Sequence, residues 1–125
     1  EVKWFYFWNN EYVTKYMRNK KKYIIQIIVQ YIRASIVRWV QLNFIAPKAD
    51  IIFLQKACIP KLKNHFLNKA KSKGVKIIFD VDDAIYLNGR DNSDDIAKIS
   101  DLIICGNKTL QAHYEMVNKR KYSFI

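Results

Sequence analysis

The segment GVKIIFDVDDAIYLNG, residues 74–89, places a short apolar run directly before three aspartates. The run VKIIF has the length and the β-branched content of a buried strand, and the glycine before it is a typical end point for a preceding helix. Asp80, Asp82 and Asp83 then follow where that strand is expected to end. The sequence therefore predicts an acidic cluster at one edge of a sheet.

The chain around this cluster is basic: 22 Lys and Arg stand against 11 Asp and Glu, a formal charge of +11. Such a charge favours anionic partners, namely nucleic acid, phosphorylated small molecules or a membrane surface. With 125 residues, half of them hydrophobic, we expect residues 1–125 to form a single domain. The two cysteines lack metal-ligand spacing, which favours a reduced, cytoplasmic setting and predicts no bound metal.

Apolar runs of strand length recur along the chain, at residues 50–55, 75–80, 101–106 and 122–125. Helix-like stretches separate them. One is expected to open at Pro60 and to end at Gly74, and another to be capped by Asn107 and to continue to about Val117. This alternation predicts an α/β fold, with a Rossmann-like, mostly parallel sheet and helices on both faces.

The first 45 residues follow other patterns. Residues 2–7 are β-branched or aromatic except for Lys3, which predicts a strand, and the following asparagine pair, residues 9–10, predicts a turn. Residues 23–45 form the longest apolar stretch, but Gln26 and Arg33 place polar groups along one helical stripe. An arginine near the middle of a membrane span costs roughly 2.5–3.5 kcal/mol. We therefore expect an amphipathic helix and no transmembrane one.

Polar or small residues follow each expected strand. In open parallel sheets, ligands bind outside the carboxyl ends of the strands, so these residues would share one rim. We expect Asp80, Asp82 and Asp83 to form the centre of a site there. The other candidates at this rim are Asn10, Lys56, Gly106 and Asn107. His113, in the last expected helix, is interpreted as a surface residue.

Short motifs in the acidic segment suggest two reactions. FDVDDA, residues 79–84, resembles the first motif of haloacid-dehalogenase phosphohydrolases, in which one Asp is the nucleophile, the next but one is the general acid, and both place Mg²⁺. The same Asp-x-Asp also resembles the metal-binding motif of GT-A glycosyltransferases. Ala84 departs from the Thr or Val usual in the phosphohydrolases, and no later lysine and acidic pair follows convincingly.

Longer segments of the sequence carry a third resemblance. ADIIFLQKACIP, KGVKIIFDVDDAIYLNG and ISDLIICGNKTLQAHYEMVN, in this order, resemble the amino-terminal domain of family 4 glycosyltransferases of the GT-B fold, and VKWFYFWNNEYVTKYM resembles the second-strand region of that domain. Members of the family begin with a further strand and continue into a second Rossmann-like domain that binds the nucleotide sugar. The resemblance implies an incomplete acceptor-side domain, which is not expected to catalyse transfer alone.

The resemblance also implies roles. Asp82 and Asp83 would be the catalytic or acceptor-positioning pair, with Asp82 at a position that often holds His in the family. Lys56 would meet a phosphate, and Asp80, Gly106, Asn107 and Asn10 would complete the acceptor side. The implied donor is a nucleotide sugar, with no further cofactor, and the acceptor is a saccharide or lipid-linked molecule of cell-surface polysaccharide synthesis.

The implied location is the cytoplasm, peripherally at an anionic inner membrane face that basic residues would contact. No nucleic-acid partner is expected, because the acidic rim opposes binding of a phosphate backbone. Two alternatives remain open: a basic α/β binding module without catalysis, and a phosphohydrolase that uses Asp80 and Asp82.

Overall fold

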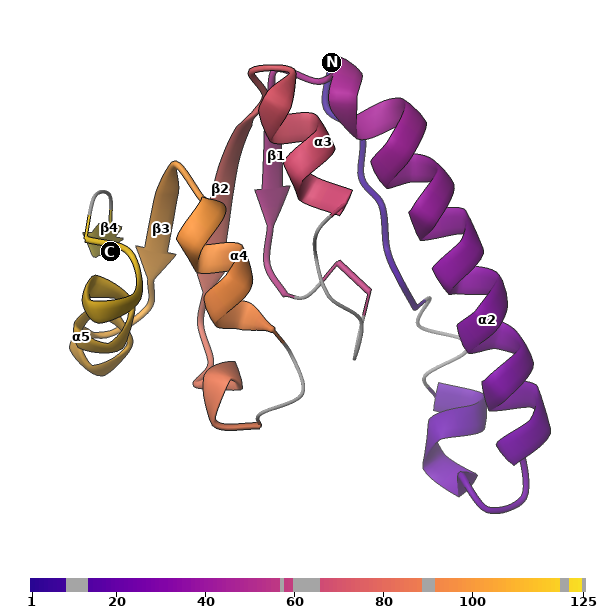
Figure 1. Cartoon of the computed structure of the whole chain (residues 1–125). Helices are drawn as coiled ribbons and strands as arrows, with labels where there is room; N and C mark the ends of the chain where they lie inside the picture. The colour runs from indigo at the N-terminus through magenta and orange to yellow at the C-terminus, as the bar shows by residue number, and fades with distance from the viewer. Residues whose placement is uncertain (9–13, 57, 60–65, 89–91, 120–121, 125) are drawn as a thin grey trace. The chain divides into compact units, whose positions relative to one another are not determined.

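The computed structural model describes residues 1–8, 14–56, 58–59, 66–88, 92–119 and 122–124, drawn in colour in Figure 1. The chain divides into two compact units, residues 1–40 and residues 41–125. Each unit is described by itself below.

Residues 1–40 contain one long helix, α2, which spans Ile24–Val40. A 3₁₀ turn, η1, precedes it at Met17–Asn19. The prediction of a strand at residues 2–7 is wrong: the structure gives these residues no strand pairing. A segment rich in aromatic residues forms no ladder without a hydrogen-bonding neighbour. The expected turn at residues 9–10, with Asn10, lies outside the described residues. Among the described residues, no helix is both long and apolar enough to cross a bilayer.

The unit of residues 41–125 holds a parallel sheet whose spatial strand order, β1-β2-β3-β4, equals the order along the chain. The strands are β1 (Ile51–Leu54), β2 (Lys76–Val81), β3 (Leu102–Cys105) and β4 (Tyr122–Phe124). The helices between them are α3 (Phe66–Ser72), α4 (Ser93–Ile99) and α5 (Lys108–Val117). Shorter turns are η2 (Gln41–Ile45), η3 (Ala46–Lys48) and η4 (Ile85–Asn88). The predicted α/β class and Rossmann-like parallel sheet are confirmed.

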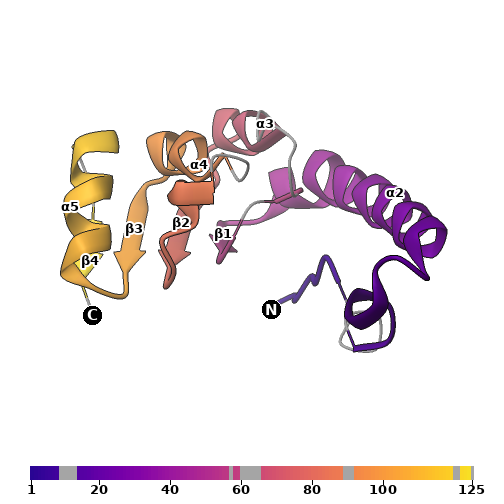
Figure 2. The same ribbon diagram turned by 90° about the horizontal axis from the view of Figure 1, so that it is seen from below.

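The core lies between one face of the sheet and the helices. Figure 2 shows α3 and α4 on the same side of the strands, and the ring of Phe79 in β2 meets the ring of Tyr114 in α5 with centroids 6.0 Å apart. Right-handed crossovers explain this arrangement, because strands added in one direction carry their connecting helices to the same face. Phe79 and Tyr114 are fully buried, as are other apolar side chains of this layer: Leu67, Ala70, Ile77, Ile96 and Ile103.

The opposite face of the sheet is more open. Ile78 and Ile104 are half-buried there, whereas Phe53 keeps 49% of its surface exposed. Among the described residues of this unit, helices therefore cover the face of the sheet that contains Phe79 and leave the face that contains Ile78 more open. Strand β2 accordingly alternates buried with less buried positions, and its three fully covered side chains are Ile77, Phe79 and Val81.

Helix α3 is ended by Gly74, as predicted. Gly74 has a φ of +85°, a left-handed conformation that glycine adopts without steric cost. Its backbone N–H donates to the carbonyl of Lys71 at 3.0 Å, and the N–H of Val75 donates to that of Ala70 at 3.2 Å. The chain is thereby turned from α3 directly into β2. The expected opening of this helix at Pro60 lies outside the described residues.

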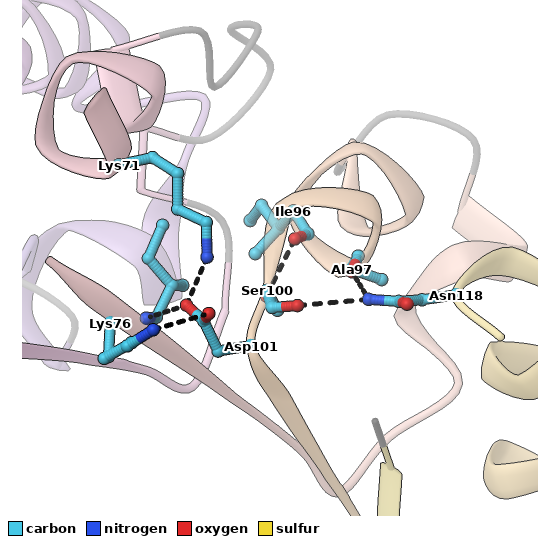
Figure 3. Close-up of polar contacts among 8 residues, drawn as sticks. Lys71, Lys76, Ile96, Ala97, Ser100, Asp101 and Asn118 are labelled. Carbon is cyan, nitrogen blue, oxygen red and sulfur yellow. Dashed lines mark hydrogen bonds and ion pairs between the residues drawn. The ribbon is translucent and has the colours of Figure 1, made fainter. Parts of the chain in front are cut away.

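Asp101, immediately before β3, ties three elements together at the amino-terminal end of the sheet (Figure 3). Its carboxylate accepts a 2.9 Å hydrogen bond from the backbone N–H of Ile77 and pairs with Lys71 of α3 and, at 3.6 Å, with Lys76. Burial by itself would raise the pKa of Asp101, but the hydrogen bond and charge of Lys71, with the Ile77 N–H and Lys76, hold the pKa below its ordinary value.

A second polar group joins the ends of α4 and α5 (Figure 3). The buried Asn118 amide donates to the carbonyls of Ala97 at 2.7 Å and Ser100 at 3.1 Å, and the Ser100 hydroxyl donates to Ile96 at 2.8 Å. Carbonyls at the end of a helix have few backbone donors. Here the N–H of Ser100 is shared between the carbonyls of Ile96 and Ala97, at 3.0 and 3.2 Å, and the side-chain bonds add further donors to these groups. The edge of the sheet opposite the acidic cluster is thus held by fixed polar contacts.

Candidate functional site

The carboxyl ends of β1, β2 and β3 bring the candidate residues to one edge of the sheet. Because the strands are parallel and adjacent, residues 55–56, 82–83 and 106–107 follow neighbouring strands at that edge. Asp80 lies within β2 rather than after it. The structure therefore places together the candidates that follow β1, β2 and β3, and Asn10 is outside the described residues.

A pocket of about 250 Å³ opens between the residues that follow β1 and those that follow β2. Its lining is mixed, with carboxylate, ammonium and amide groups beside two aliphatic residues. The lining residues are Gln55, Lys56, Val81, Asp82, Asp83 and Ile85. Such a lining offers hydrogen-bond acceptors and a cation to a small polar ligand.

Two polar contacts link residues at the carboxyl ends of β1 and β2 at this pocket. The amide nitrogen of Gln55 donates to Oδ2 of Asp80 at 3.2 Å. The ammonium of Lys56 lies 4.0 Å from Oδ2 of Asp83, with 73% and 74% of the two side chains exposed. An ion pair this long and this exposed contributes little to stability. Lys56 and Asp83 can therefore turn toward a ligand at small cost.

Gly106 approaches the acidic loop closely. Its backbone N–H donates to the carbonyl of Val81 at 3.0 Å. A Cβ atom at this position would lie 3.5 Å from both Cα and Oδ1 of Asp82, an ordinary contact distance. The backbone of Gly106 thus lies close to the acidic loop, but this approach does not require glycine. A side chain here would instead cover part of the Asp82 carboxylate.

Asn107 is the N-cap of α5, as the sequence predicts. Its side-chain oxygen accepts a 2.9 Å hydrogen bond from the backbone N–H of Leu110. This bond satisfies one of the amide groups that a helix start leaves without a partner. The cap fixes the start of α5 beside Gly106. Cys105, the last residue of β3, is buried, and burial raises the pKa of its thiol.

The turn that follows the acidic loop is held by an aromatic stack that the sequence reasoning missed. Tyr86 of η4 stacks on the ring of His113 in α5, with centroids 3.7 Å apart and an interplanar angle of 7°. The Nε2 atom of His113 lies 2.9 Å from Oδ1 of Asp94 in the first turn of α4. The interpretation of His113 as a surface residue is wrong, because its side chain is largely enclosed by these neighbours. Nothing local in the sequence indicates a contact between residues 27 positions apart.

Chemically, the site offers two exposed carboxylates, Asp82 and Asp83, opposite a lysine. Carboxylates can accept hydrogen bonds from hydroxyl groups or take a proton from one, and the lysine can pair with an anion. Within the described part of the chain, no group of three His, Cys, Asp or Glu side chains is arranged to hold a metal ion.

The fold and this edge together define a Rossmann-like α/β unit with a small polar pocket at the carboxyl edge of its sheet. No family model matches the chain, and no curated protein or solved structure matches it either.

Proposed function

We propose that the chain is the acceptor-side domain of a glycosyltransferase, which transfers a sugar from a nucleotide-sugar donor to a saccharide or lipid-linked acceptor. The observation that carries this proposal is the pocket between Lys56 and the Asp82–Asp83 pair at the carboxyl edge of the parallel sheet. Each of the three longer motifs that resemble family 4 enzymes contains one of the strands β1, β2 and β3, which form this edge.

The size and lining of the pocket support a sugar unit as ligand. Its volume of about 250 Å³ is below the roughly 300–1,000 Å³ typical of pockets for drug-sized ligands. Carboxylates and an amide suit the hydroxyl groups of a sugar, because each carboxylate oxygen accepts from a hydroxyl donor. The Ile85 side chain in the lining can contact the apolar face of a sugar ring.

In this proposal Asp82 accepts the proton of the acceptor hydroxyl, or stabilises positive charge that develops on the transferred sugar. Asp83 positions the acceptor, and Lys56 exchanges its weak contact with Asp83 for a phosphate of the donor or of a lipid diphosphate. The nucleotide would be held mainly by a second domain, and no further cofactor takes part. The reaction would take place at the cytoplasmic face of a membrane.

The test uses the complete polypeptide that contains this chain. Purified protein is incubated with a panel of nucleotide sugars and membrane extract, and both labelled product and released nucleoside diphosphate are measured. Asp82→Asn is expected to lower the rate by about 10²–10⁴-fold, the usual contribution of a general base. Asp83→Asn is expected to raise the KM for acceptor more than it lowers kcat. The control, Asp95→Asn, changes an exposed aspartate of α4 and should keep full activity.

Two results would contradict the proposal. Absence of transfer with every donor, or full activity of the folded Asp82→Asn and Asp83→Asn variants, would leave the acidic loop without a role in transfer. Release of phosphate from a phosphomonoester in the presence of Mg²⁺, lost in Asp80→Asn, would instead support the phosphohydrolase alternative.

A further inference from the structure

Helix α2 exposes a continuous apolar stripe. Seven of its side chains recur at spacings of one, three and four residues, which places them on one helical face. They keep between 42% and 71% of their surface exposed. We call these residues the α2 stripe: Ile25, Ile28, Val29, Ile32, Ile36, Trp39 and Val40. At 1.5 Å per residue, the helix extends this face over about 25 Å.

The other side of α2 contacts residues of its own unit. The ring of Tyr31 lies 5.9 Å from that of Phe7 and 6.2 Å from that of Trp8, between centroids. The guanidinium of Arg38 donates to the carbonyl of Phe5 at 3.0 Å. The expected amphipathic helix is thus present, but within residues 1–40 its more polar side packs and its apolar side is open. Exposed apolar surface of this extent marks an interaction site.

The charge around the stripe indicates which partner it fits. Residues 1–40 contain eight Lys and Arg but two Glu. Lys20, Lys21 and Lys22 form an exposed basic cluster just before the helix, and Arg33 is exposed along one border of the stripe. A second copy of this chain would bring two such positive surfaces together, and like charges oppose that contact. An anionic surface would neutralise them.

We propose that the α2 stripe inserts into the headgroup region of an anionic lipid bilayer, with α2 lying in the plane of the membrane. The combination of an apolar face, a tryptophan and flanking basic residues is that of interfacial helices. Lysines close to an anionic leaflet add attraction, and the long Arg33 side chain can reach the headgroups while its stem stays with the stripe. The inference is independent of the proposed sugar transfer.

The test measures co-sedimentation of the 125-residue chain with vesicles of phosphatidylcholine alone or of equal parts phosphatidylcholine and phosphatidylglycerol. We expect binding to the anionic vesicles that weakens as salt is added. Ile28→Gln with Ile32→Gln should lower the partition coefficient at least about tenfold, because two apolar side chains no longer enter the bilayer. Met116→Gln, which changes a side chain 74% exposed on α5, is the matched control and should bind normally.

A second pair of variants tests the charge. Lys21→Gln with Lys22→Gln should weaken binding about thirtyfold, at about 1 kcal/mol for each lysine near the surface. Lys108→Gln with Lys119→Gln removes the same charge from exposed positions outside residues 1–40 and should have a much smaller effect. Circular dichroism checks that each variant keeps its helix content.

Three results would overturn the proposal. They are failure of the chain to bind anionic vesicles, equal binding by the stripe variant, and a dimer in sedimentation velocity that the stripe variant dissociates. The sugar-transfer assay reports on the acidic loop separately, so failure of one proposal leaves the other standing.

Discussion

Replacing Asp101 by alanine tests what holds the amino-terminal edge of the sheet. The change removes the acceptor of the Ile77 N–H, 2.9 Å away, and the ion pair with Lys71. Ile77 is fully buried, so its N–H would lose its partner out of reach of water. A hydrogen bond to a charged group contributes about 1.5–3 kcal/mol. The more exposed Lys76 adds little.

From these terms we expect Asp101→Ala to lower the free energy of unfolding by about 2–4 kcal/mol. Asp101→Asn keeps an oxygen for the Ile77 N–H but loses the charge, and should cost about half as much. The pKa of Asp101 is lowered in the folded state, so its contribution is complete above the ordinary value of 3.8 and is lost as the pH falls below it. The difference between the wild type and either variant should therefore be full at neutral pH and shrink below about pH 4.

The assay is urea unfolding of the 125-residue chain, followed by circular dichroism at several pH values. The control is Asp50→Ala, because Asp50 precedes β1 as Asp101 precedes β3, but its side chain is exposed. It should change stability by less than about 0.5 kcal/mol. If Asp101→Ala is as stable as the wild type, or if Asp50→Ala costs as much, the Asp101 contacts do not hold this edge.

Substitutions at two further positions test the core at Tyr114 and the cap of α5 at Asn107. The buried Tyr114 hydroxyl has no hydrogen-bond partner of suitable geometry among the described residues. Burial, partly offset by the nearby Ser93, raises the pKa of Tyr114 to about 12. Tyr114→Phe should therefore change the free energy of unfolding at neutral pH by no more than about 0.5 kcal/mol. The wild type is expected to lose stability above pH 10, and the variant should not show this loss. If urea unfolding at neutral pH shows that the variant is less stable by more than about 1 kcal/mol, the Tyr114 hydroxyl is hydrogen-bonded. Asn107→Ala should cost about 1 kcal/mol and Asn107→Asp almost nothing, because aspartate also caps. Equal thermal midpoints for those two variants would argue against the cap.

The predictable parts of the fold are those that short stretches of sequence determine. The run before Asp80 is apolar and β-branched, and Gly74 supplies the left-handed turn that ends α3, so β2 and its boundary could be predicted. Asn107 could be predicted as a cap from its place between an apolar run and a helix. The gathering of Lys56 and Asp82 at one rim followed from the parallel arrangement alone.

The unpredicted parts depend on residues far apart in the sequence. Residues 2–7 have the composition of a strand, but a strand also needs a neighbour, which composition does not supply. The stack of Tyr86 on His113 and the pairing of Asp101 with Lys71 join elements that only the packing of α3, α4 and α5 brings together. The exposure of the α2 stripe likewise depends on which side of the helix packs, which periodicity does not reveal.

The strand order of the sheet has a consequence for how the chain folds. Paired residues in successive strands are 25 positions apart for Ile51 and Lys76, 24 for Ile78 and Leu102, and 19 for Ile103 and Tyr122. Each pairing thus closes a loop of similar, moderate length. Each of these strands can pair with the strand before it without needing a strand that comes later in the chain. A ribosome releases the chain from its amino terminus, so each strand can dock on the one before it as soon as it emerges. This sheet is suited to growing in step with synthesis.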